Sequence, residues 1–181
     1  TYSNQLYSYI GETDTTLPNA LAQYFYVDKA TYPNGFNLTD LHFQGQNGQN
    51  PVIEIYDGSR TISTASLIQK VNYDFWLYNY PITLKEQIHF APGSSFWVVA
   101  KFPAGAKNPL GTGKTTRTDV AQYSFYSSDN GTTWTQLSEV LKGTSFEAVA
   151  SQLTWAVKAI SKNPDWSQVL NPEPISGEVR P

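Results

Sequence analysis

The sequence predicts an all-β fold of the β-sandwich type, and three observations support this prediction. Aromatic residues form 14% of the chain, which favours strands because rings pack well on a pleated surface. Turn signals made of Gly, Pro, Asn and Asp recur at short intervals, for example at 33–35, 57–58 and 91–93. A hairpin motif occupies residues 127–134. Short strands separated by such signals are typical of sandwiches and barrels.

Alternation of apolar and polar residues predicts the strands in chain order. The predicted strands are 23–30, 36–44, 51–56, 82–90, 96–102 and 122–127. In the third of these, Ile53 and Ile55 point inward. Pro92 and Gly93 form the turn that we expect between the fourth and the fifth.

The hairpin motif reads Ser-Ser-Asp-Asn-Gly-Thr-Thr-Trp and matches the Asp-box pattern Ser-x-Asp-x-Gly-x-Thr-Trp, beginning at Ser127. We expect Asp129 to accept hydrogen bonds from the backbone of its own turn and Gly131 to adopt a positive φ. Trp134 then begins the return strand and buries its ring. Propellers repeat this motif once per blade, whereas here it occurs once in a chain without an internal period. The motif therefore predicts a single structural hairpin.

Two further segments need an explicit interpretation. Residues 108–118 are rich in Gly and Thr and predict a long surface loop. This loop is not a phosphate-binding loop, because the Walker pattern requires a glycine where Asn108 stands and no apolar helix follows. Residues 153–161 fit helical spacing and strand alternation equally well, and we favour a strand.

Prolines recur after residue 163, as in the segment 171–174, without any hydrophobic period. We therefore predict a sandwich domain over 1–163, and over 164–181 a linker with the start of a following domain.

Composition excludes several partners. The net charge is −3 with no long run of either sign, so nothing attracts nucleic acid or an anionic membrane. No apolar stretch approaches the length of a membrane span. Cysteine is absent, which excludes disulfides.

The motifs do not predict catalysis within this chain. No Gly-x-Ser-x-Gly elbow is present, and His42 and His89 lie in predicted strands without recognisable partners. Two histidines and no cysteine do not supply the usual zinc ligands. We expect no cofactor, although a structural Ca²⁺ is possible at carboxylates next to loops. The candidates are Asp28, Asp57, Asp119 and Asp129.

An aromatic run at 73–80 predicts a binding strip. In a strand, Trp76, Tyr78 and Tyr80 share one face. Such strips bind sugars, because the apolar face of a pyranose stacks on aromatic rings. The alternative is that the rings are buried under a loop or a neighbouring domain.

Three stretches together resemble a known module. They are Pro-Gly-Ser-Ser-Phe-Trp-Val-Val at 92–99, Pro-Leu-Gly at 109–111, and Ser-Phe-Tyr-Ser-Ser at 124–128 followed by Trp134. They resemble the accessory β-sandwich that follows the catalytic domain in secreted bacterial subtilisin-like serine peptidases. The tail, 166–179, is similar to the entry strand of an immunoglobulin-like repeat. The resemblance implies a jelly-roll-like topology, a secreted or cell-surface location, and no catalytic residue in the module.

Two functions are compatible with these observations. The first is a non-catalytic accessory module that packs against neighbouring domains of the same chain and presents a surface to a protein substrate. The second is a carbohydrate-binding module of a secreted enzyme or adhesin that binds a glycan. Exposure of the rings at Trp76, Tyr78 and Tyr80 would favour the second.

Overall fold

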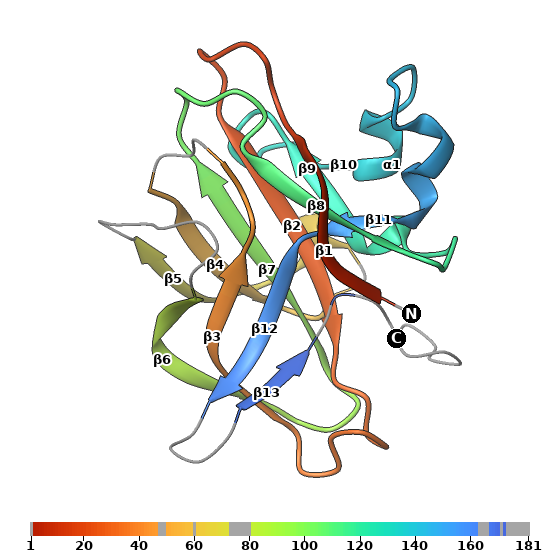
Figure 1. Cartoon of the computed structure of the whole chain (residues 1–181). Helices are drawn as coiled ribbons and strands as arrows, with labels where there is room; N and C mark the ends of the chain where they lie inside the picture. Colours follow the sequence, from red (N-terminus) through yellow and green to blue (C-terminus); the bar gives the residue numbers. More distant parts are fainter. Residues whose placement is uncertain are drawn as a thin grey trace.

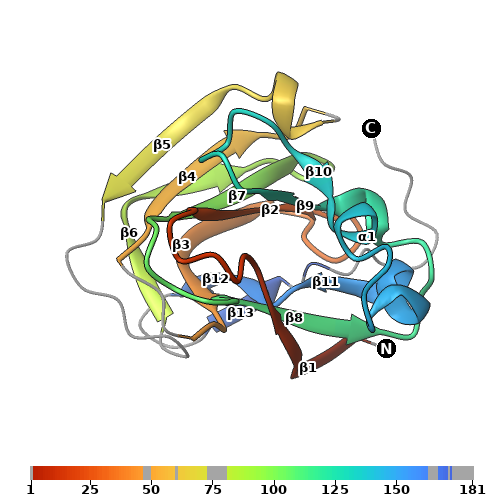
Figure 2. The ribbon, with the colours of Figure 1, turned by 90° about the horizontal axis from the view of Figure 1, so that it is seen from above.

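The computed structural model describes residues 2–46, 50–59, 61–72, 81–162, 167–170 and 172. Antiparallel strands form two facing layers, which Figure 1 shows from the side and Figure 2 from above. The predicted all-β sandwich is confirmed. The jelly-roll connectivity stays a prediction. Within the described chain, no helix is both long enough and apolar enough to cross a membrane.

One layer is a single six-stranded sheet. Its strands, in spatial order, are β10 (Thr135–Gln136), β9 (Ser124–Ser127), β2 (Asn19–Tyr26), β7 (Ser95–Phe102), β4 (Val52–Asp57) and β5 (Leu67–Asn72). Short helical turns connect the strands. They are η1 (Ile62–Thr64), η2 (Ala121–Tyr123), α1 (Leu137–Val140) and η3 (Glu147–Gln152).

The other layer consists of two smaller sheets. A four-stranded sheet has the order β13 (Ser167–Leu170), β12 (Val157–Lys162), β3 (Phe36–Phe43) and β6 (Pro81–Phe90). A three-stranded sheet has the order β1 (Tyr2–Ile10), β8 (Leu110–Thr115) and β11 (Leu153–Trp155).

Backbone hydrogen bonds at Ala156, between β11 and β12, join the two smaller sheets. Ala156 N donates to Gly111 O at 2.9 Å, Gln44 N donates to Ala156 O at 3.0 Å, and Gly111 N donates to Gln44 O at 3.0 Å. A Cβ on Gly111 would lie 2.5 Å from Gln44 O. This close approach requires glycine at position 111.

Aromatic stacking links the two layers through the main core. Phe90 of β6 stacks on Phe96 of β7 at 4.2 Å between ring centroids, and Phe96 stacks on Phe25 of β2 at 5.3 Å. The predicted turn between β6 and β7 is present, with Gly93 at φ 79°. Because β6 and β7 belong to different layers, this turn crosses from one face of the sandwich to the other.

A second cluster buries the outer face of the six-stranded sheet. At its centre the fully buried Trp97 meets Tyr24 edge-on at 5.2 Å between centroids. Trp97 Nε1 donates to Ser59 O at 2.7 Å, which ties the loop after β4 over this face. Ile62 in that loop is also buried. The sheet is therefore apolar on both sides.

A buried amide ties the two layers together within the main core. Gln23 of β2 is 0% exposed, and its Oε1 accepts hydrogen bonds from Ser124 Oγ at 2.7 Å and Trp155 N at 3.1 Å. Trp155 belongs to β11 in the other layer, where its strand pairs with β8. The Gln23 side chain therefore accepts a hydrogen bond from a backbone N–H across the sandwich.

Residues 108–118 do not form the predicted loop. Leu110–Thr115 is β8, an interior strand paired with β1 and β11. The loop prediction was wrong because this strand is built from Gly and Thr, whose small side chains give no hydrophobic alternation. Ladders to β1 and β11 on both sides hold it in place, together with Leu110 in the main core and a hydrogen bond between Thr112 and Ser8.

The C-terminal part of the sandwich extends beyond the predicted boundary. Ser167–Leu170 is β13, which pairs with β12 from Ala159 opposite Leu170 to Lys162 opposite Ser167. Leu170 is 7% exposed and belongs to the main core. Residues 167–170 therefore belong to the sheet rather than to the predicted linker. The following immunoglobulin-like domain stays a prediction.

The strand favoured over 153–161 is confirmed, in two pieces. β11 and β12 are separated only at Ala156, where the chain passes from one small sheet to the other. Between residues 146 and 161, helical structure is confined to η3, just before β11.

We predict that Gln23→Leu destabilises the sandwich by about 1–3 kcal/mol, because Trp155 N and Ser124 Oγ then lose a buried acceptor. Urea unfolding followed by tryptophan fluorescence measures the loss. Gln87→Leu, at an exposed position of β6, is the matched control and should change the free energy of unfolding by less than about 0.5 kcal/mol. Equal effects of the two variants would contradict a bridging role for Gln23.

Candidate functional site

The hairpin tip between β9 and β10 is held by its own polar side chains. Asp129 Oδ1 accepts from Ser127 Oγ at 2.6 Å and from Thr133 N at 2.9 Å, and Oδ2 accepts from Thr133 Oγ1 at 2.5 Å. Ser127 Oγ accepts from Gly131 N at 2.9 Å. Asn130 and Gly131 have φ values of 62° and 89°. Hydrogen bonds from Ser127 and then Thr133 lower the pKa of the exposed Asp129 carboxyl from 3.8 to about 2.

This tip leans over the outer face of the six-stranded sheet, as Figure 2 shows from above. A Cβ on Gly131 would lie 2.9 Å from Lys101 Cε and 3.3 Å from Trp134 Cζ2. The glycine therefore lies directly against the lysine stem of β7 and the half-buried Trp134 ring. The side chains of Asp129 and Ser127 stabilise the turn, and the missing side chain of Gly131 lets the turn pack closely on the sheet.

An ion pair lies beneath the tip. Lys101 Nζ is 2.9 Å from Glu54 Oε1, and their side chains are 21% and 5% exposed. Tyr56 OH donates to the same Glu54 oxygen at 2.6 Å. Burial, with the Glu54 hydrogen bond next, raises the pKa of the Tyr56 hydroxyl. Alternation in β4 and β7 directs all three side chains to the outer face.

Two hollows flank Lys101, and we refer to the pair as the Lys101 groove. The smaller, of about 200 Å³, is lined by Tyr56, Ile62, Ser63, Ala65, Lys101, Gly131, Thr132 and Trp134. The larger, of about 390 Å³, is lined by Pro18, Asn50, Val52, Glu54, Lys70, Lys101, Pro103, Ala104 and Asn130. The groove thus combines aromatic rings, a neutralised ion pair and hydrogen-bonding groups, which is the composition of a small-ligand site.

Neither Glu54 nor Lys101 was among the residues that the sequence singled out. Each is a charged residue inside an apolar strand, Glu54 between two isoleucines and Lys101 between Ala100 and Phe102. That pattern is a usable signal, because a charge in a buried strand needs a partner. The identity of the partner depends on which strands are neighbours.

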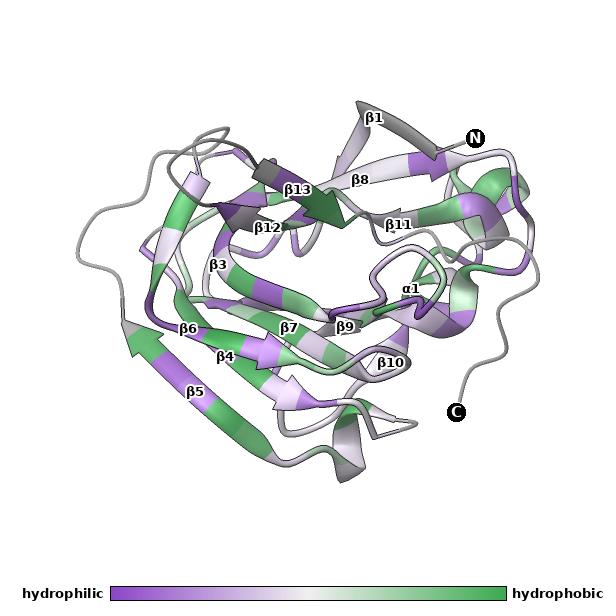
Figure 3. Cartoon of the chain, turned by 90° about the horizontal axis from the view of Figure 1, so that it is seen from below, coloured by the Kyte–Doolittle hydropathy of each residue, from purple (hydrophilic) through white to green (hydrophobic). Residues whose placement is uncertain are grey.

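A larger groove lies between the edge strands β5 and β6. It encloses about 690 Å³ and includes Ile68, Ile88 and the turn before β7. Leu67 and Ile68 of β5 are 50% and 47% exposed, and Figure 3 shows β5 with hydrophobic segments on either side of a hydrophilic middle. The one carboxylate of its lining, Asp57, is already bonded within its own loop. Its other polar side chains, His89, Ser59, Ser94 and Ser95, are also each engaged in a hydrogen bond within the protein.

The calcium candidates Asp28 and Asp57 each accept hydrogen bonds from residues of their own loop. Asp28 Oδ2 accepts from Thr31 N at 2.9 Å and Thr31 Oγ1 at 2.8 Å. Asp57 Oδ1 accepts from Ser59 Oγ at 3.0 Å and Ser66 N at 3.1 Å. The hydrogen bonds from Thr31 lower the pKa of the Asp28 carboxyl. The hydrogen bond from the Ser66 backbone is the main cause that lowers the pKa of the Asp57 carboxyl.

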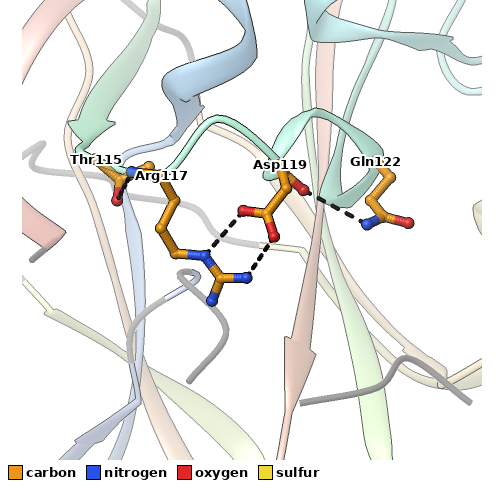
Figure 4. A network of polar contacts seen from close by, with 4 residues as sticks. All are labelled: Thr115, Arg117, Asp119 and Gln122. Atoms are coloured by element: carbon orange, nitrogen blue, oxygen red, sulfur yellow. Dashed lines mark hydrogen bonds and ion pairs between the residues drawn. The ribbon is translucent and has the colours of Figure 1, made fainter. Parts of the chain in front are cut away.

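Asp119 is likewise engaged in its own loop, as Figure 4 shows. Its carboxylate forms a two-point contact with Arg117, with Nε at 2.8 Å from Oδ1 and Nη2 at 2.5 Å from Oδ2. The hydrogen bond from Arg117 lowers the pKa of the Asp119 carboxyl. Arg117 N donates to Thr115 Oγ1 at 3.2 Å, which anchors the turn to the end of β8.

The structure does not bring the four candidate carboxylates together. Among the described residues, no three His, Cys, Asp or Glu side chains cluster so as to hold a metal ion. His42 lies in β3 opposite Lys158, and the exposed His89 places Nδ1 2.6 Å from Asn37 Oδ1. Trp76, Tyr78 and Tyr80 lie outside the described residues, so the aromatic strip stays a prediction.

Comparison with protein-family models, with curated proteins and with solved structures finds no match to this chain. The resemblance to the accessory modules of secreted peptidases therefore rests on the sequence motifs alone.

We predict that Gly131→Ala destabilises the protein more than Gly143→Ala. Both glycines have a positive φ, but an added Cβ has no atom within 4 Å at Gly143, whereas at Gly131 it meets Lys101. The backbone strain should cost each variant about 1–2 kcal/mol. Displacement of the ion pair should cost Gly131→Ala about 1 kcal/mol more. Urea unfolding measures both losses, and equal losses would show that the tip does not press on Lys101.

We predict that Asp129 stabilises the hairpin at neutral pH and loses this effect in acid. Its folded pKa of about 2 lies below the ordinary 3.8, so the stabilisation is complete above the ordinary value and is lost as the pH falls through the folded one. Thermal melts across this range should show a steeper acid decline for the wild type than for Asp129→Asn. Parallel profiles, or an NMR titration of this carboxyl near its ordinary value, would contradict the prediction.

Proposed function

We propose that this chain is a non-catalytic accessory module of a secreted multidomain protein and that it acts by binding through the Lys101 groove. The observation that supports this most directly is the ion pair between the buried Glu54 and the partly exposed Lys101 at the floor of the groove. Burial of the carboxylate of such a pair costs desolvation energy, and a few polar groups that converge in a hollow are typical of a binding site.

The lining of the groove favours binding over chemistry. Among its described residues Glu54 is the single carboxylate, whereas glycoside hydrolysis ordinarily uses two. Ser63 stands in the lining without a histidine beside it there, and a serine nucleophile ordinarily requires an adjacent base. Catalysis, if the parent protein performs it, is assigned by this proposal to another domain.

The location and partners of the module follow from the resemblance and are part of the proposal. Neighbouring domains of the same chain are the expected intramolecular partners, and a peptidase-like domain is the expected catalytic neighbour. A surface module of this kind would hold a protein or glycan target near that domain.

A carbohydrate-binding module is the second candidate, and one observation favours it. Trp134 and Tyr56, both half-buried, line the smaller hollow together. Partly exposed rings beside hydrogen-bonding groups suit the apolar and polar faces of a sugar.

We predict that the chain fused to a fluorescent protein is retained on insoluble polysaccharides or on immobilised extracellular-matrix proteins. Trp134→Ala and Lys101→Met should lower retention by roughly tenfold, as loss of a central contact does. Lys162→Met is the control, because Lys162 is exposed on β12 in the opposite layer. Retention on neither class of target, or equal retention of all four proteins, would contradict the proposal.

A further inference from the structure

The carboxylate of Glu54 has unused acceptor capacity. Glu54 is 4% exposed, and its Oε1 receives both Lys101 Nζ and Tyr56 OH. No described residue donates a hydrogen bond to Oε2. Solvent reaches this oxygen. Since Glu54 lines the larger hollow, a ligand hydroxyl in that hollow would replace water as its donor.

The ammonium of Lys101 has unused donors next to this acceptor. Nζ has three donors, and within the described chain its polar partner is Glu54 Oε1 at 2.9 Å. Lys101 lines both hollows. The groove floor therefore presents a free acceptor and free donors side by side, on two neighbouring strands.

The charge of this floor selects against ions. Glu54 and Lys101 neutralise each other, so an anionic group would meet the carboxylate and a cationic group would meet the ammonium. Lys70, which lies opposite Glu54 across the β4–β5 ladder and also lines the larger hollow, is exposed at its rim, where the attraction of a surface charge for an anion is weak. A hydroxyl group satisfies both partners, because it donates one hydrogen bond and accepts others.

The walls of the groove suit the apolar faces of a ring. Trp134 and Tyr56 line one hollow, and Pro18 and Pro103 line the other. The larger hollow falls within the range of roughly 300–1,000 Å³ usual for small-molecule sites. In the larger hollow, which contains both Glu54 and Lys101, the apolar Pro18, Val52 and Pro103 beside this polar floor suit a pyranose, whose hydroxyls lie at the rim of an apolar face.

We infer that the Lys101 groove binds a neutral saccharide, in which Glu54 Oε2 accepts a hydrogen bond from one hydroxyl and Lys101 Nζ donates to a neighbouring one. The inference rests on the proposed function of the groove as the binding face. It adds the class of ligand and the two atoms that recognise it.

The test is a glycan array with neutral and acidic saccharides, followed by calorimetry with the neutral saccharide that binds best. Glu54→Gln and Lys101→Met should each weaken binding by roughly tenfold or more, because hydrogen bonds to charged groups are the strong ones. The controls Glu86→Gln and Lys162→Met, both at exposed positions outside the groove, should bind like the wild type.

A second measurement covers the case in which a groove variant does not fold. In the wild-type protein, NMR titration with the same saccharide should shift the signals of Trp134, Gly131 and Lys101 and leave those of β12 unchanged. Shifts confined to other regions would overturn the inference.

The outcomes separate this inference from the proposed function. Groove-dependent retention on matrix proteins, without binding of any neutral saccharide, would overturn the inference and leave the proposed function standing. Retention that does not depend on the groove would overturn both. If the wild-type protein preferred an acidic saccharide and Lys70→Ala lost that preference, the assignment of a neutral saccharide as the ligand would be overturned.

Discussion

The structure depends on one constraint, which is that the six-stranded sheet is apolar on both faces. β2 and β7 are buried along nearly their whole length. The second layer covers one face, and loops must cover the other, because exposed apolar area of this size is unfavourable in water. Trp97 organises this second cover, since its ring lies in the outer cluster and its Nε1 holds the backbone of Ser59.

A cover made of loops is incomplete, and the candidate site lies where it ends. Residues of the loop after β4 and of the 127–134 hairpin line the smaller hollow together, and the larger hollow lies on the other side of Lys101. Beside the hollows, the aromatic residues of the outer face give way to charged ones. Tyr56 is followed there by the ion pair of Glu54 and Lys101. The hairpin therefore has two roles, because the same turn that Asp129 stabilises also forms one wall of the groove.

The fold could be predicted from local pattern wherever strands have large alternating side chains. The strands predicted at 36–44, 51–56, 82–90 and 96–102 match β3, β4, β6 and β7 within one or two residues. β8 was missed because Gly and Thr give no alternation, and β13 because nearby prolines obscure a short strand. Of the site, the turn of Ser127, Asp129 and Gly131 was predictable, whereas Trp134 precedes β10 and is only half-buried, against the prediction. The pairing of Glu54 with Lys101 depends on which strands are neighbours and was not predictable.

The sequence by itself determined the geometry of short segments, because the relevant forces act between residues a few positions apart. The bonds of Asp129 within its turn and the positive φ of Gly131 are of this kind. Tertiary structure alone decided that β6 and β7, neighbours in sequence, lie in opposite layers. It also decided that Lys101 meets Glu54. Hydrophobic period specifies which face of a strand is buried, but not which strand lies beside it, so contacts between distant strands emerge only when the whole core packs.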